Sequence, residues 1–283
     1  MASIYVSSAC SPISDLEDNL KYFKSLGMER VELSGGLDYE ENVEDRMREL
    51  SQEIGIQLQL HNYSPPPKKS FVLNLASLHE ETHRESLQHV IKSLEITKSM
   101  NLGKYAVHAG FYMPILTSEL GKMIKKRDLF DREQCMSVFV DVIRSLYQQY
   151  GPSLYVENNV ISTQNFEQYG ENPLMLTCAR EYFELKEAIP ELQLLLDLAH
   201  LKVSCRTLGL TFEEEVSLLI DETDYLHLSG NDGLTDSNMG IEKASDIYNV
   251  LADADLTGRT ITLEVYSGTE DLERSYALIN ELI

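Results

Sequence analysis

Hydrophobic and polar positions alternate in one pattern along the whole chain: short apolar, β-rich runs are followed by longer stretches of helical periodicity. Eight runs read as strands, at residues 3–9 (SIYVSSA), 30–35 (RVELSG), 57–63 (QLQLHNY), 104–110 (KYAVHAG), 154–159 (LYVENN), 193–199 (QLLLDLA), 225–230 (YLHLSG) and 260–266 (TITLEVY). Helices are predicted between them, at residues 15–27, 41–55, 78–100, 131–151, 174–188, 212–220, 241–252 and 270–283. Capping boxes are expected at Ser14, Ser77 and Thr211, because a Glu follows each three residues later.

Eight strand–helix pairs predict an α/β fold, a single (β/α)8 TIM barrel that forms one domain over residues 1–283. Parallel strands need crossover helices, and a closed sheet leaves no exposed edge. We find no linker or shift of composition that would divide the chain. An open doubly wound sheet is the alternative, but the segment after the first strand, SSACSPISD, lacks the glycine-rich phosphate loop typical of that fold.

Composition narrows the partners. The 283 residues include 24 basic and 46 acidic side chains, and the net charge of −22 argues against a nucleic-acid partner. No apolar run reaches the roughly 18 residues of a membrane span, so no membrane partner is expected. The four cysteines are far apart and show neither metal-site nor disulfide spacing, which favours a reducing, cytoplasmic location.

Residues of metal-binding type gather where the predicted strands end. They are Glu32, His61, His108, Glu157, Asp197 with His200, His227 and Glu264. In a barrel these positions share the C-terminal face, where active sites lie. Carboxylates and imidazoles from separate strands suit one divalent ion such as Zn, Mn or Co, and this ion is expected to satisfy Asp197 at the end of its apolar run. We predict Glu157, Asp197, His227 and Glu264 as the ligands and expect no organic cofactor.

The same segments resemble those of the xylose-isomerase-like TIM barrels, a family that includes sugar isomerases and epimerases, inosose dehydratases and the AP endonuclease IV group. The resemblance rests on HNY…NLAS (61–77), YAVHAG (105–110), LYVENN (154–159), LLLDLAH (194–200), YLHLSGND (225–232) and ITLEVY (261–266). It implies that Glu157, Asp197, His227 and Glu264 form the metal site of the epimerase branch and that His200 contacts substrate. It also suggests a homodimer.

Two branches of this family remain to be separated. The endonuclease branch binds three zinc ions and resembles this chain at His61, His108 and His200, but Asn238 stands where it has a further histidine. An amide is a poor substitute for imidazole on zinc. The epimerase branch usually has an arginine shortly after the histidine of strand seven, and HLSGNDG has none. An endonuclease-like phosphodiesterase and an inosose-type dehydratase therefore stay as alternatives.

The leading hypothesis is a metal-dependent isomerase or epimerase that acts on a sugar, sugar phosphate or polyol through a metal-stabilised enediolate. Glu157 and Glu264 would move the proton as catalytic residues. His61 and His108 are expected to bind substrate, with additional metal ligation as the alternative. Basic residues after strand four, Lys125 and Arg127 among them, are expected to attract an anionic group of a small carbohydrate-like substrate, unless they form only a solvated charge run.

Overall fold

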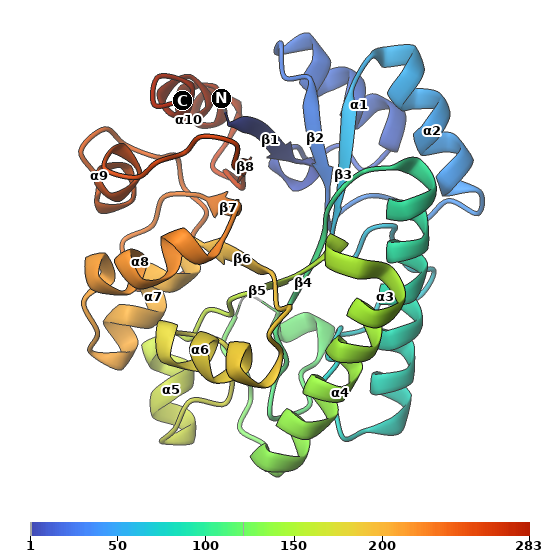
Figure 1. Ribbon diagram of the computed structural model, residues 1–283. Helices are drawn as coiled ribbons and strands as arrows, with labels where there is room; N and C mark the ends of the chain where they lie inside the picture. Colours follow the sequence, from blue (N-terminus) through green and yellow to red (C-terminus); the bar gives the residue numbers. More distant parts are fainter. Residues whose placement is uncertain (1, 121) are drawn as a thin grey trace.

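The computed structural model describes residues 2–120 and 122–283, and these form a closed barrel of eight parallel strands in sequential order. The predicted fold class is confirmed. The strands are β1 (Ser3–Ser7), β2 (Arg30–Leu33), β3 (Gln57–His61), β4 (Tyr105–His108), β5 (Leu154–Glu157), β6 (Leu194–Asp197), β7 (Tyr225–Leu228) and β8 (Thr260–Leu263). Figure 1 shows them at the centre, and pairing of β1 with β8 closes the ring.

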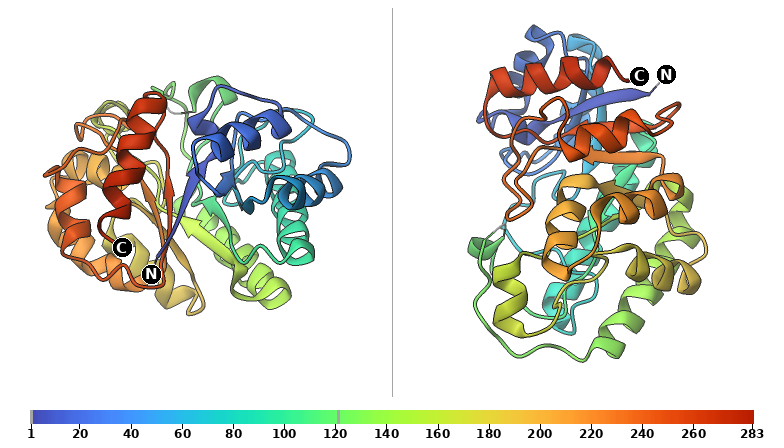
Figure 2. Two further views of the ribbon diagram at one scale, coloured as in Figure 1. Left: turned by 90° about the horizontal axis from the view of Figure 1, so that it is seen from above. Right: turned by 90° about the vertical axis from the view of Figure 1, so that its left-hand side faces the viewer.

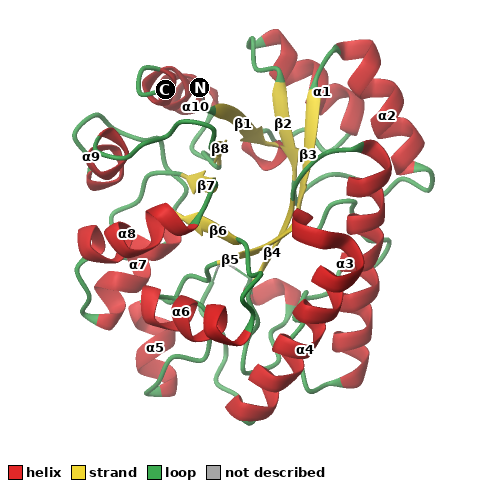
Figure 3. Ribbon diagram, in the orientation of Figure 1, coloured by secondary structure: helices red, strands yellow, loops and turns green. Residues whose placement is uncertain are grey.

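Helices surround the barrel on all sides (Figure 3). They are α1 (Leu16–Ser25), α2 (Val43–Ile54), α3 (Glu80–Met100), α4 (Arg132–Tyr150), α5 (Thr163–Tyr169), α6 (Ala179–Ala188), α7 (Leu198–Leu208), α8 (Phe212–Leu219), α9 (Asp246–Ala252) and α10 (Thr269–Asn280). The strand β1 and the last helix, α10, lie next to each other in all views (Figure 2). Within the described ranges, no helix combines the length and the apolar character needed to cross a membrane.

The strands are shorter than the sequence pattern predicts, since each has four or five residues. The clearest error is at the sixth strand, which was expected to reach residue 199. It ends at Asp197, and Leu198 already begins α7, a helix that the pattern did not reveal. The apolar residues of LLLDLAHL suit both elements, so periodicity could not locate the boundary. The short helix α5 was also missed.

The three predicted capping boxes are wrong as hydrogen-bonded motifs. Asp15, not Ser14, caps α1, because the hydroxyl of Ser14 donates to Asp38. The helix α3 begins later than expected, after His79, and Thr211 precedes α8 without a side-chain cap bond. Local spacing alone did not determine how these hydroxyl groups pair.

The register of the strands positions the polar side chains at the C-terminal end of the barrel. His108 lies directly beside Glu157 across β4 and β5, and Asp197 lies beside His227 across β6 and β7. The apolar residues below them form one large core between the strands and the helices. Polar groups from distant parts of the chain therefore meet at one end of the barrel.

Candidate functional site

Four side chains that were predicted as metal ligands converge at the C-terminal end of the barrel. Glu157, Asp197, His227 and Glu264 each offer one ligand atom, and these atoms lie within 4.8 Å of one another. All four residues are buried. The structure thus brings the predicted set together, and its role as a metal site remains a prediction.

A second group overlaps with the first at Glu157. The side chains of His61 and His108 lie 2.7 and 3.3 Å from Glu157 Oε2, through Nε2 and Nδ1 respectively. One ligand atom from each of the three residues could serve a common ion. His61 and His108 were expected near the site, and the structure places them there beside the carboxylate that both groups share.

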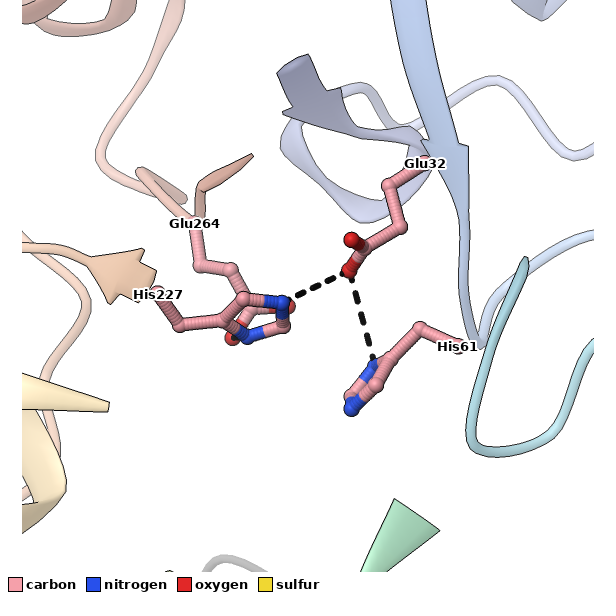
Figure 4. Close-up of side chains that lie close together, drawn as sticks. All are labelled: Glu32, His61, His227 and Glu264. Atoms are coloured by element: carbon pink, nitrogen blue, oxygen red, sulfur yellow. Dashed lines mark ion pairs between the residues drawn. The ribbon is translucent and has the colours of Figure 1, made fainter. Parts of the chain in front are cut away.

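Glu32 was grouped with the strand-end residues of metal-binding type, but it was not among the predicted ligands. Its Oε1 lies 2.8 Å from His227 Nε2, between the imidazoles of His227 and His61 (Figure 4). Its Oε2 accepts hydrogen bonds from three buried side chains, Gln59, Tyr225 and Thr262. Because Nε2 of His227 faces Glu32, Nδ1 is the nitrogen that faces Glu264 and Glu157, at 3.4 and 3.7 Å.

Asp197 and His200 form a hydrogen bond with each other at the N-terminus of α7. Asp197 is the N-cap of α7, and its Oδ1 accepts the backbone N–H of His200 at 2.8 Å. The expectation that a cation alone would satisfy Asp197 was therefore incomplete, because the helix N-terminus supplies one partner. His200 itself lies in the first turn of α7 and not on a strand, and its Nε2 is 3.2 Å from Asp236.

Burial and neighbouring charge shift the pKa values of the buried carboxyl groups in opposite directions. Burial acts to raise the pKa of Glu157, but the imidazoles of His108 and His61 outweigh it and hold that pKa well below its ordinary value. Burial raises the pKa of Asp197 to about 7. For Glu264, the imidazole of His227 outweighs burial and lowers the pKa to about 2. Burial lowers the pKa of His108 to about 4, which keeps that ring neutral and able to accept or ligate.

The donor set fits a divalent cation. Among the described residues, Glu32 Oε1, Glu157 Oε1 and both ring nitrogens of His227 are buried atoms without a hydrogen-bond partner, and Glu157 Oε1 and His227 Nδ1 face the four-residue group. Glu157 and Glu264, whose pKa values lie below the ordinary value, also place negative charge at buried positions. A bound cation relieves both costs, and oxygen with imidazole nitrogen is a ligand set for ions such as Zn, Mn or Co.

A family model described as xylose isomerase-like TIM barrel matches residues 20–282. The chain belongs to this xylose isomerase-like TIM barrel family. The predicted resemblance is thus confirmed. A search of curated proteins found no match to the sequence.

Solved structures with a similar fold cover almost the whole chain of this family member. A D-tagatose 3-epimerase-like protein has a TM-score of 0.73 at 15% identity, over 99% of this chain and 96% of the other. The D-psicose 3-epimerase of Clostridium cellulolyticum, solved with D-tagatose, has a TM-score of 0.65 at 13% identity, over 99% and 98%. A Thermus thermophilus protein soaked with zinc chloride has a TM-score of 0.63 at 19% identity, over 99% and 97%. At these identities the likeness shows the fold.

A cavity of about 650 Å³ adjoins the polar groups, and His108, His200 and Asp236 form part of its wall. Lys122 also lines this cavity. Lys125 and Arg127 belong to the residues that the structure describes, but they do not line it. The guanidinium of Arg127 lies 2.8 Å from Glu119 Oε1 and so holds the loop after β4 together. The proposed contact of Lys125 and Arg127 with substrate stays a prediction.

Two supporting residues of the site were not recognised in the sequence. The side-chain amide of Asn158 donates one hydrogen bond to the backbone of Asp197 and accepts another from it. The backbone carbonyl oxygen of Asn158 lies 3.0 Å from His200 Nδ1. Tyr266 donates to Glu264 Oε1 at 3.0 Å. Only their positions in the sequence could have indicated these roles. Asn158 directly follows Glu157, and Tyr266 comes two residues after Glu264.

Proposed function

We propose that the protein is a divalent-metal-dependent isomerase or epimerase that acts on a small carbohydrate-like carbonyl compound. The observation that carries the proposal is the buried meeting of Glu157, Asp197, His227 and Glu264 beside a cavity of substrate size. Similar structures titled as D-tagatose 3-epimerase-like and D-psicose 3-epimerase support the substrate class.

A bound Zn, Mn or Co ion would supply Lewis acidity toward a carbonyl oxygen and a neighbouring hydroxyl oxygen. Glu157, Asp197, His227 and Glu264 would hold it. No organic cofactor is needed for this chemistry.

Proton transfer is assigned to two carboxylates that approach from different sides of the barrel. Glu157 ends β5, and Glu264 follows β8. One would remove the proton from the carbon next to the carbonyl, and the other would return it. Return to the opposite face of the same carbon gives epimerisation, and return to the adjacent carbon gives isomerisation between aldose and ketose.

Histidines at the cavity would orient the substrate. His200 is fixed from two sides, since its Nδ1 faces the Asn158 carbonyl at 3.0 Å and its Nε2 faces Asp236 at 3.2 Å. His108 lines the same wall, and His61 Nε2 forms a hydrogen bond with Glu157 Oε2. Side chains held by several contacts provide the preorganisation that proton transfer requires.

The test is solvent deuterium exchange. The metal-loaded protein is incubated in D₂O with a panel of ketohexoses, and deuterium at the carbon next to the carbonyl is followed by NMR. Glu157→Gln and Glu264→Gln are expected to lose exchange by at least a hundredfold, in line with the loss of a general base. Glu49→Gln, a change on the exposed surface of α2, serves as the control.

Metal content by elemental analysis separates this proposal from its rivals. One bound ion that is necessary for exchange supports the isomerase or epimerase. Three ions with cleavage of a phosphodiester would favour the endonuclease-like alternative, and loss of water from an inosose would favour the dehydratase. Absence of exchange with every ketose in the metal-loaded protein would overturn the proposal.

A further inference from the structure

The cavity of about 650 Å³ beside the candidate site is lined by both polar and apolar side chains. The polar side chains include His108, His200 and Asp236, which belong to the site. A monosaccharide bound there would leave much of the cavity to water. What lines the remaining space therefore bears on the shape of the substrate.

About half of the residues in that remaining wall are apolar. They include Leu73, Phe111, Ile115, Met123, Val160 and Leu174. These residues come from the loops after β3, β4 and β5, and Phe111 and Leu174 are joined by a backbone bridge. Phe111 and Leu174 belong to a hydrophobic cluster separate from the main core, and Ile115 packs against it, so this part of the wall is a packed structure. These apolar side chains offer no hydrogen-bond partner to a polyol.

Several polar residues of the wall are already engaged with the backbone. Glu119 accepts from the N–H groups of Leu116 and Lys125 and from Arg127. Asn165 accepts from the N–H of Ile124, and Asn159 donates to backbone carbonyl groups at 2.9 Å. These side chains organise the loops and have little bonding capacity left for a ligand.

Large apolar side chains of the same wall are exposed to solvent. The exposed fractions are 38% for Leu120, 51% for Met123 and 46% for Leu234. Leu120 and Met123 belong to the loop after β4, and Leu234 belongs to the loop after β7. Exposed apolar groups that converge on one cavity are typical of a binding surface that a ligand covers.

We propose that the substrate carries an apolar group, alkyl or aryl, on its carbohydrate-like part, and that this group covers the apolar side chains of the cavity wall. The inference rests on the proposed function, because the polar part of the substrate is taken to reach His108 and His200. The occupant is thus an amphipathic glycoside or a similar conjugate, and a free hexose is a partial substrate.

Binding of alkyl β-D-glucopyranosides tests the proposal. Methyl, propyl, pentyl and heptyl glucosides are titrated by calorimetry into the metal-loaded protein, below the concentrations at which they form micelles. Affinity is expected to rise by about two- to fourfold for each added methylene, the effect of moving that group out of water. The gain is expected to disappear in the double variant Met123→Asp, Leu234→Asp.

Leu218→Asp provides the matched control, because Leu218 is 52% exposed on α8 and outside the described wall of the cavity. It should keep the full dependence on chain length. An affinity that does not change with chain length, or a gain that survives in the double variant, overturns the inference. Deuterium exchange on free ketohexoses is measured on the same preparations. Its absence would refute the proposed function and leave the chain-length result standing, so the two failures can be told apart.

Discussion

Glu32 is the best place to test how the barrel interior prepares the candidate metal site. Burial acts to raise its pKa, but His227 outweighs burial and keeps the pKa below its ordinary value, so the group is a carboxylate at neutral pH. Its Oε1 faces His227 Nε2 at 2.8 Å. Burial acts to lower the pKa of His227, but Glu32 and Glu264 outweigh it and raise that pKa well above its ordinary value, so the ring is protonated without a metal ion. A metal ion would displace the proton from Nδ1, and a remaining proton on Nε2, next to Glu32, is the usual arrangement of a ligating histidine.

The perturbation is Glu32→Gln, which preserves size. The amide oxygen can still accept from Thr262 and Gln59, which lie 2.7 and 2.9 Å from Glu32 Oε2. The amide N–H₂ group then faces His227 Nε2, which must accept instead of donate, so the ring proton moves to Nδ1. Loss of such an outer partner typically lowers metal affinity 10- to 100-fold, about 1.4–2.7 kcal/mol. The free energy of unfolding of the metal-free protein should fall by about 1–3 kcal/mol, because a charged acceptor is lost.

Metal affinity is measured by competition between the protein and a chelator for Zn²⁺ or Co²⁺, and stability is measured by urea unfolding of the metal-free form. Gln59→Met is the control, since it removes a neutral donor to the same carboxylate without touching His227. It should lower stability and leave metal affinity nearly unchanged. If Glu32→Gln binds the ion as tightly as the unmodified protein, the reasoning about the tautomer is wrong.

Three further outcomes are expected. Zn, Mn or Co at a hundredfold excess over Kd should raise Tm by roughly 5–10 °C, and calorimetry should show most of this gain lost in Glu264→Gln. Lys125→Ala should raise KM roughly two- to fivefold for a sugar phosphate only. Arg127→Ala removes the ion pair with Glu119 and should therefore raise KM for neutral and anionic sugars alike. Equal effects of the two variants in steady-state assays would contradict this prediction. Burial lowers the pKa of His89, so the unfolded chain binds a proton at a higher pH than the folded protein does, and the free energy of unfolding falls as the pH drops below about 6.5. The dependence of Tm on pH should be weaker in His89→Gln. An unchanged slope would refute this.

Much of the site was readable because of one property of parallel barrels. All strands end on the same face, so a carboxylate or imidazole at the end of each predicted strand had to lie near the others. This made Glu157, Asp197, His227 and Glu264 a predictable set. It required only the strand pattern, and errors of two or three residues at the strand ends did not matter.

The sequence by itself therefore determined the barrel and the residue types that meet at its open end, because both depend on periodicity and on local order along the chain. Only the tertiary structure decided which groups meet: that Glu32 Oε1 lies 2.8 Å from His227 Nε2, that the N-terminus of α7 partners Asp197, and that loops after β3, β4, β5 and β7 line one cavity. These features depend on strand register and on the packing of loops far apart in sequence, and local patterns do not encode such long-range contacts.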